Sequence, residues 1–64
     1  MVKINGEEWN AAGQTVTQYL TENGYDIKRV AVELNGEILP KLQYENTLLQ
    51  EGDCVEIVSF VGGG

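Results

Sequence analysis

Three consecutive glycines, Gly62, Gly63 and Gly64, end the chain and follow directly on Phe60-Val61. Glycine has no Cβ atom, so such a segment can thread a narrow channel and adopt backbone conformations that other residues avoid. It also leaves the carboxyl carbon of Gly64 open to attack from several sides. A carboxylate is a poor acyl donor by itself, but adenylation by ATP gives it a good leaving group. The sequence therefore predicts a flexible tail whose terminal carboxylate is activated by an enzyme.

The other residues that could do chemistry give weaker signals. The chain has no histidine, which removes the usual general base near neutral pH and the commonest zinc ligand. Cys54 therefore has no histidine to activate it, and we interpret it as a partly packed thiol at the start of a strand. The acidic groups at Glu7-Glu8 and Glu51-Gly52-Asp53 are typical of solvated turns, since a hard metal needs more oxygen ligands in one place. We expect no catalytic residue, no metal and no bound cofactor.

The composition predicts one small soluble domain. The chain has 64 residues, of which 42% are hydrophobic and 22% charged, which is ordinary for a globular protein. Its net charge of −6 repels phosphate backbones and anionic lipid. We therefore expect neither nucleic acid nor a membrane as a partner, and favour a partner with a basic surface. A single cysteine and the lack of a membrane-spanning stretch predict a cytoplasmic location.

The elements that position the tail are predicted from periodicity. Residues 2–9 alternate around Asn5-Gly6, the strongest short signal for a hairpin with a type I′ turn. Trp9 is the one large ring available to the core from this hairpin. Residues 15–24 have helical spacing, and Thr15 begins a Thr-x-x-Gln capping box. The sequence therefore predicts a hairpin over residues 2–9 and a short helix over residues 15–24.

The second half of the chain predicts two more strands before the last one. Residues 30–34 alternate and lead into a second turn at Asn35-Gly36, and Pro40 ends the strand pairing that follows. Residues 41–49 have no clean period, so we expect an irregular link that contains one helical turn. Tyr44 in this link, like the other tyrosines, is interpreted as an edge residue of the core.

The final strand, residues 54–60, places Val58 and Phe60 on its outward face, immediately before the tail. Two exposed apolar side chains beside a reactive end predict a contact patch for a partner protein. The alternative is that a neighbouring loop covers them. Acidic residues such as Glu33 and Glu56 would add electrostatic steering toward a basic partner.

These elements give the order ββαβ(β)β, an α+β protein in which a mixed sheet packs on one helix. With the two terminal strands together at the centre of the sheet, this is a β-grasp domain of residues 1–61 with a flexible glycine tail of residues 62–64. The predicted core consists of Val2, Ile4, Val16, Leu20, Val30, Val32, Leu34, Val55 and Ile57.

The segments MVKING, VAVELNGEILP and LLQEGDCVEIVSFVGGG together resemble the ThiS family, the ubiquitin-like sulfur carriers of thiamin biosynthesis. The resemblance implies that an E1-like adenylyltransferase of the ThiF type uses ATP and magnesium to adenylate Gly64. It implies that a sulfur donor, such as a cysteine desulfurase, converts the adenylate to a thiocarboxylate. Thiazole synthase of the ThiG type then accepts the sulfur, so the chain would be a co-substrate and not an enzyme.

The resemblance also assigns roles within the tail. Gly63 and Gly64 correspond to the family's Gly-Gly ending, and Gly62 is an additional glycine that we interpret as extra slack. Gly62 and Gly63 would thread the partner's active site. Three alternatives remain open: the small subunit of molybdopterin synthase, a ubiquitin-like modifier attached to lysines through Gly64, and an interaction domain with an idle tail.

Overall fold

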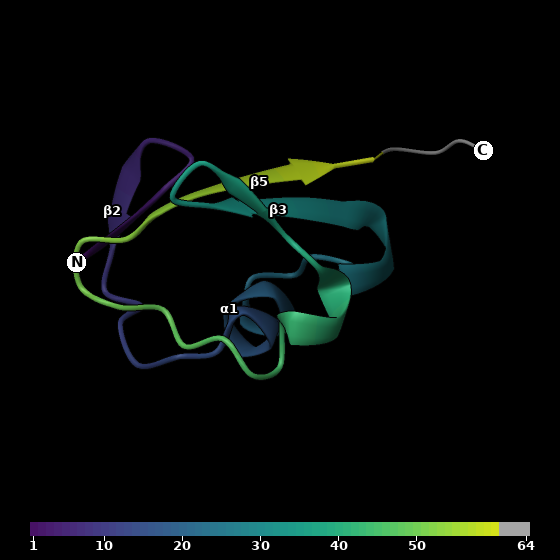
Figure 1. Ribbon diagram of the computed structural model, residues 1–64, viewed down its shortest axis with the longest axis horizontal. Coiled ribbons are helices and arrows are strands. Elements are labelled where there is room, and N and C mark those ends of the chain that lie inside the picture. Colours follow the sequence, from purple (N-terminus) through teal and green to yellow (C-terminus); the bar gives the residue numbers. More distant parts are fainter. Residues whose placement is uncertain (61–64) are drawn as a thin grey trace.

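The computed structural model describes residues 1–60, so the predicted tail, residues 62–64, lies outside the described residues together with Val61. The described chain forms five strands, one α-helix and two short 3-10 helices (Figure 1). In chain order these are β1 (Val2–Ile4), β2 (Glu7–Trp9), α1 (Val16–Glu22), η1 (Ile27–Arg29), β3 (Val30–Leu34), β4 (Glu37–Leu39), η2 (Lys41–Gln43) and β5 (Cys54–Ser59).

The strands form one mixed sheet in the order β2-β1-β5-β3-β4. The two terminal strands, β1 and β5, are parallel neighbours, and every other pair is antiparallel. Helix α1 lies on one side of the sheet (Figure 1). This arrangement confirms the predicted β-grasp fold, with β5 at the centre of the sheet.

Both Asn-Gly turns adopt the predicted conformation and also clamp β5. Asn5 and Asn35 have φ of 50° and 52°, as a type I′ turn requires at its first central residue. The Asn5 amide donates to the Ile57 carbonyl at 3.2 Å and accepts from the Ile57 N–H at 2.8 Å. The Asn35 amide oxygen accepts from the Cys54 N–H at 2.9 Å. The turns therefore hold the strand that leads to the tail in register.

Helix α1 begins with the predicted capping box. The Thr15 hydroxyl accepts from the Gln18 N–H at 3.0 Å, and the Gln18 side chain accepts from the Thr15 N–H at 2.9 Å. The helix is only two turns long, so packing of its buried face on the sheet must hold it. Its buried residues are Val16, Tyr19 and Leu20.

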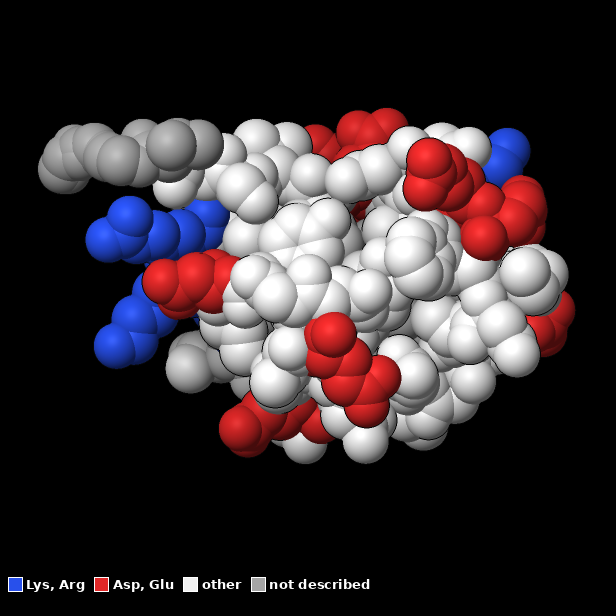
Figure 2. All heavy atoms as spheres, turned by 180° about the vertical axis from the view of Figure 1, so that it is seen from behind, with Lys and Arg blue, Asp and Glu red and all other residues white. Residues whose placement is uncertain are grey.

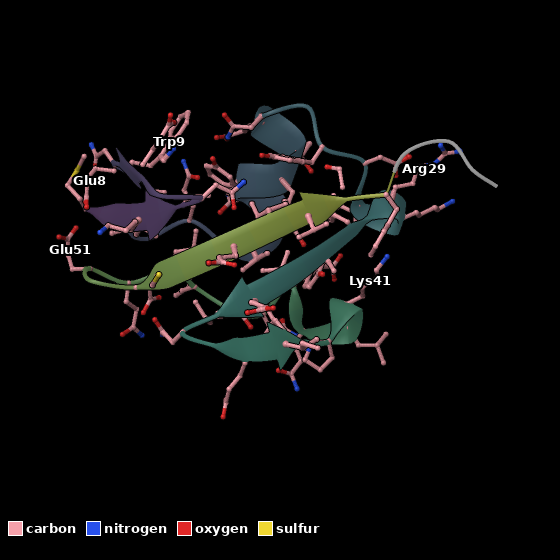
Figure 3. The ribbon with its side chains drawn as sticks, turned by 90° about the horizontal axis from the view of Figure 1, so that it is seen from above. Glu8, Trp9, Arg29, Lys41 and Glu51 are labelled. Atoms are coloured by element: carbon pink, nitrogen blue, oxygen red, sulfur yellow. The ribbon has the colours of Figure 1, made fainter. Side chains whose placement is uncertain are left out.

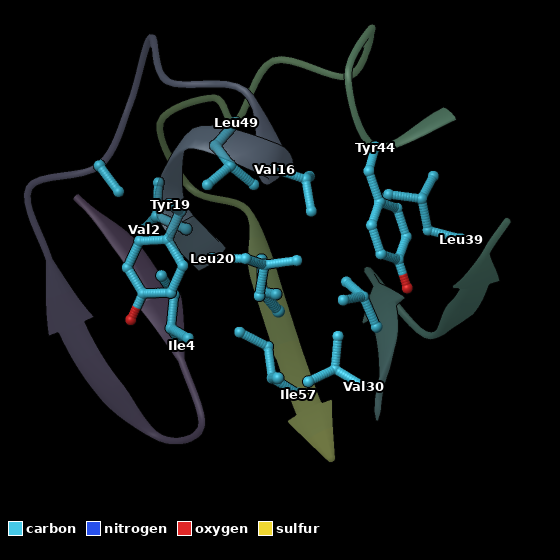
Figure 4. Close-up of a cluster of buried hydrophobic side chains, with 13 residues drawn as sticks. Val2, Ile4, Val16, Tyr19, Leu20, Val30, Leu39, Tyr44, Leu49 and Ile57 are labelled. Carbon is cyan, nitrogen blue, oxygen red and sulfur yellow. The ribbon is translucent and has the colours of Figure 1, made fainter. Parts of the chain in front are cut away.

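The core differs from the prediction at three aromatic residues. Tyr19, interpreted as an edge residue, is 5% exposed and belongs to the core, because it lies on the buried face of α1. Tyr44 is 1% exposed and lies beside Leu39 in the buried cluster, so its interpretation as an edge residue is wrong (Figure 4). Trp9 is 39% exposed, because it lies on the edge strand β2 and packs edge-on against Tyr19 with ring centroids 5.7 Å apart. The predicted core residue Leu34 is only partly buried. The buried cluster comprises Val2, Ile4, Ala11, Val16, Tyr19, Leu20, Val30, Val32, Leu39, Tyr44, Leu49, Val55 and Ile57.

Candidate functional site

The site is built on β5, the central strand of the sheet. This strand pairs with β1 on one side and β3 on the other, and its register with β3 runs to Ser59 opposite Val30. One residue further, the Phe60 N–H donates to the Arg29 carbonyl at 2.7 Å. The backbone is thus hydrogen-bonded to the body up to the last described residue. Whatever follows Phe60 in the sequence starts from a fixed point.

Figure 3 views the outer face of the sheet, on the side opposite α1. This face presents apolar side chains next to that point. Val58 and Phe60 are 56% and 59% exposed, as the alternation predicted, so no loop within residues 1–60 covers them. Val58 lies opposite Ala31 of β3, and the exposed Ile38 of β4 lies on the same face, one strand further out. The residues form an open apolar surface, and their contact with a partner stays a prediction.

Two carboxylates adjoin this apolar surface. Glu33 and Glu56 are direct cross-strand partners in the β3–β5 pairing, and both are exposed. Like charges opposite each other in a sheet cost roughly 0.2–1 kcal/mol relative to neutral pairs. A cationic group from a partner would relieve this repulsion, and the preference for a basic partner surface stays a prediction.

Cys54 lies far from the start of the tail. It is the first residue of β5, six residues before Phe60, which corresponds to roughly 20 Å at about 3.3 Å per residue. It is exposed, and not partly packed as predicted, because its side chain lies on the outer face of the sheet. A shallow depression there is lined by Met1, Lys3, Glu8, Gly52, Asp53 and Cys54. The structure does not bring the thiol toward the tail.

Two further features bear on what the described chain can do. Within residues 1–60, no group of three or more His, Cys, Asp or Glu side chains is arranged to hold a metal ion. Among the same residues, no helix is long and apolar enough to cross a membrane. The chemistry predicted from the sequence therefore centres on the tail that follows β5 and on the surface around its start.

Two components of the site were not predicted from the sequence. The side chains of Asn5 and Asn35 hold β5 through hydrogen bonds as well as forming turns, and Ile38 extends the apolar face. The exposure of Ile38 could have been predicted, because Ile38 and Leu39 are neighbours on the strand after the Asn35-Gly36 turn and must point to opposite faces of the sheet. The asparagine clamps had no signal in the sequence, since their partners lie 52 and 19 residues away along the chain.

The mixed sheet, the single helix and the exposed central strand are those of a ubiquitin-like β-grasp protein. Within that class the chain belongs to the ThiS family, whose family model matches residues 2–64. The resemblance found in the sequence is thereby confirmed.

Individual proteins agree with this assignment. The sulfur carrier protein ThiS of Thermus thermophilus is 41% identical over 64 residues, with both chains fully covered. The crystal structure of a thiamine biosynthesis protein (ThiS) from Geobacter metallireducens superimposes with a TM-score of 0.77 at 34% identity, covering 98% of this chain and 97% of that one. A thiazole synthase of Paramagnetospirillum magneticum is 52% identical over 62 residues, or 95% of this chain. The chain spans 19% of the length of that synthase.

Proposed function

We propose that this protein is a sulfur carrier for thiazole formation in thiamin biosynthesis. An E1-like adenylyltransferase uses ATP and magnesium to adenylate Gly64, a sulfur donor converts the adenylate to a thiocarboxylate, and thiazole synthase receives the sulfur. The protein is a co-substrate of these enzymes. The observation that carries the proposal is the anchoring of β5 up to Phe60, beside exposed Val58 and immediately before the glycines of the sequence.

The chemistry assigns one role to the Gly64 carboxyl group. A carboxylate oxygen attacks the α-phosphorus of ATP and displaces pyrophosphate. The terminal sulfur of a persulfide, on a donor such as a cysteine desulfurase, then attacks the acyl carbon and AMP leaves. A thiol reduces the resulting acyl disulfide, so the donor sulfur enters a new disulfide and the carrier retains the thiocarboxylate. This anion is nucleophilic through sulfur at neutral pH and still activated at carbon.

The folded body contributes binding. Ordering a glycine segment in a channel costs roughly 1–2 kcal/mol per residue. Contacts made elsewhere on the carrier must offset that cost, and the apolar surface around Val58 and Phe60 is placed to make them.

Two relatives support thiazole synthase as a partner. The synthases of Paramagnetospirillum magneticum and Magnetococcus marinus each contain a segment similar to almost all of this chain, at 52% and 41% identity. Joining a carrier to its acceptor on one polypeptide raises the effective concentration of the carrier. We infer the same pairing of carrier and acceptor for this chain.

Substitution of Val58 tests the apolar surface. Val58→Asp is expected to raise the KM for the carrier in ATP–pyrophosphate exchange by about tenfold to thirtyfold, because it places a desolvated charge in the contact. The value of kcat should change little. Leu48→Asp is the matched control, because it adds the same charge at a position that is similarly exposed. Leu48 is 54% exposed and lies on the link between η2 and β5. An equal KM for the two variants would remove Val58 from the interface.

Growth tests the function as a whole. Expression of this chain in a bacterial strain that lacks its own thiamin sulfur carrier is expected to restore growth without added thiamin. Restored molybdenum-enzyme activity without restored thiamin synthesis would favour the molybdopterin alternative. Conjugates on lysines, with no thiocarboxylate, would favour a protein modifier.

A further inference from the structure

Three of the four basic residues of the chain gather where β5 ends. Lys28 and Arg29 belong to η1, and Lys41 belongs to η2. Figure 3 places Arg29 and Lys41 at the same end of the molecule, opposite the end that holds Glu8 and Glu51. In Figure 2 most of the blue side chains likewise lie at one end. We call Lys28, Arg29 and Lys41 the tail-base cations.

Hydrogen bonds fix this group to the start of the tail. The Arg29 carbonyl accepts from the Phe60 N–H at 2.7 Å, so Arg29 is the direct neighbour of the last described residue. The Lys41 ammonium donates to the Lys28 carbonyl at 2.9 Å and so links η2 to η1. Asp26 caps η1 by accepting from the Lys28 N–H at 3.0 Å. Two short helices therefore bring together cations that lie 13 residues apart in sequence.

Most basic side chains lie at one end of the molecule, whereas acidic side chains are spread over the face that Figure 2 shows. The chain has 10 acidic and 4 basic residues, so the remainder without the tail-base cations carries 1 − 10 = −9. Asp26 lies 3.7 Å from Arg29, so the tail-base cations together with Asp26 carry 3 − 1 = +2, and the rest of the chain then carries 1 − 9 = −8. Both members of that ion pair are more than half exposed, so their attraction is weak and leaves Arg29 available to a partner.

We propose that the tail-base cations dock on an acidic rim around the entrance through which the activating enzyme admits the tail. This inference rests on the proposed function. A carrier of charge −6 is repelled by a site loaded with ATP, and a cationic leading end reduces that repulsion and orients the approach. The glutamates of the outer face then meet a separate, basic part of the same partner.

The length of the tail indicates whether these cations contact the enzyme surface or the bound nucleotide. Four residues separate Phe60 from the terminus, and a chain spans at most about 3.3–3.6 Å per residue, or roughly 14 Å in total. The phosphates of ATP lie at the reacting carboxyl group, whereas the cations belong to the body. A tail that threads a channel separates the two. The cations therefore face the enzyme surface around the entrance.

Charge reversal at single positions tests the proposal, with ATP–pyrophosphate exchange by the E1-like enzyme of the same organism as the assay. Arg29→Glu and Lys28→Glu are each expected to raise the KM for the carrier about fivefold at low ionic strength. The effect should shrink at high salt, with kcat within about twofold of its original value. Lys3→Glu is the matched control: it changes the net charge equally, and Lys3 pairs with Cys54 at the far end of β5.

A neutral variant keeps the test valid if charge reversal perturbs folding. Lys28→Gln/Arg29→Gln/Lys41→Gln is expected to raise the same KM at least about tenfold, and thermal unfolding verifies that it remains folded. A rise in the KM for ATP instead would place the cations at the nucleotide and overturn the proposal. An effect no larger than that of Lys3→Glu would also overturn it, while leaving the sulfur-carrier function intact. Absence of exchange with the unaltered carrier would overturn the proposed function itself.

Discussion

A chain that lacks Gly63 and Gly64 is expected to lose carrier-dependent ATP–pyrophosphate exchange, by at least about a thousandfold. The truncated chain still ends in a glycine carboxylate, that of Gly62, but this group starts about 7 Å closer to the anchored end of β5. Misplacement of a reacting atom by even 1 Å can cost about a hundredfold in rate. Because Phe60 is hydrogen-bonded to Arg29, the body cannot advance to compensate without losing its own contacts.

Deletion of Gly62 alone is the matched control for this truncation. It shortens the chain by one residue and keeps the Gly-Gly ending. If Gly62 supplies slack, the bound tail is not fully extended, so the carboxyl group still reaches its position and we expect at most about a tenfold loss. Growth without thiamin should follow the exchange rates. Wild-type exchange by the chain without Gly63 and Gly64 would contradict the role of the terminal carboxyl group.

Tyr44→Ala is expected to destabilise the fold by about 3–5 kcal/mol. Tyr44 is 1% exposed and stands between the sheet and the link that follows β4, so its loss opens a cavity beside Leu39 (Figure 4). A domain of this size has a free energy of unfolding at the low end of about 5–15 kcal/mol. Denaturant unfolding should therefore show a chain that is largely unfolded or barely stable.

Leu42→Ala is the control for this substitution, because Leu42 belongs to the same link and is 93% exposed. Its effect should stay within about 0.5 kcal/mol. If Tyr44→Ala lowered the free energy of unfolding no more than Leu42→Ala, the conclusion that the link packs on the sheet through Tyr44 would be wrong.

Alkaline pH offers a second test of Tyr44. Burial raises the pKa of its phenol above the ordinary value, and a hydrogen bond with the Val32 backbone partly opposes that rise. The neutral phenol is therefore favoured in the folded state. The contribution of neutral Tyr44 to the stability of the fold is fully present below the unfolded tyrosine pKa of about 10. It is lost as the pH rises through the pKa of Tyr44 in the folded state. Tyr44→Phe should weaken this alkaline loss of stability, leaving the contribution of Tyr19, whose pKa burial also raises.

Local signals in the sequence predicted the elements well. Alternation, the two Asn-Gly turns and the Thr15 capping box each involve neighbours a few residues apart, and the structure confirms all three. The outward placement of Val58 and Phe60 follows from the same alternation. These are the features that position the candidate site, so most of that site was predictable.

Contacts between distant segments account for what the sequence could not predict. Tyr44 is buried because the link folds back over the sheet, and Trp9 is partly exposed because its strand lies at the edge. Neither fact has a periodic signal. The tail-base cations come from two separate 3-10 helices and meet at the end of a third segment, so only the folded chain brings them together.

The central claim is that the Gly64 carboxyl group carries the sulfur, and intact mass spectrometry tests it most directly. The carrier is incubated with the E1-like enzyme, ATP and a persulfide donor, and the modified peptide is then sequenced. We predict replacement of one oxygen by one sulfur on Gly64, and no change in a carrier whose terminus is blocked as an amide. Sulfur found on Cys54 instead, or delivered by the amide-blocked carrier, would contradict the account.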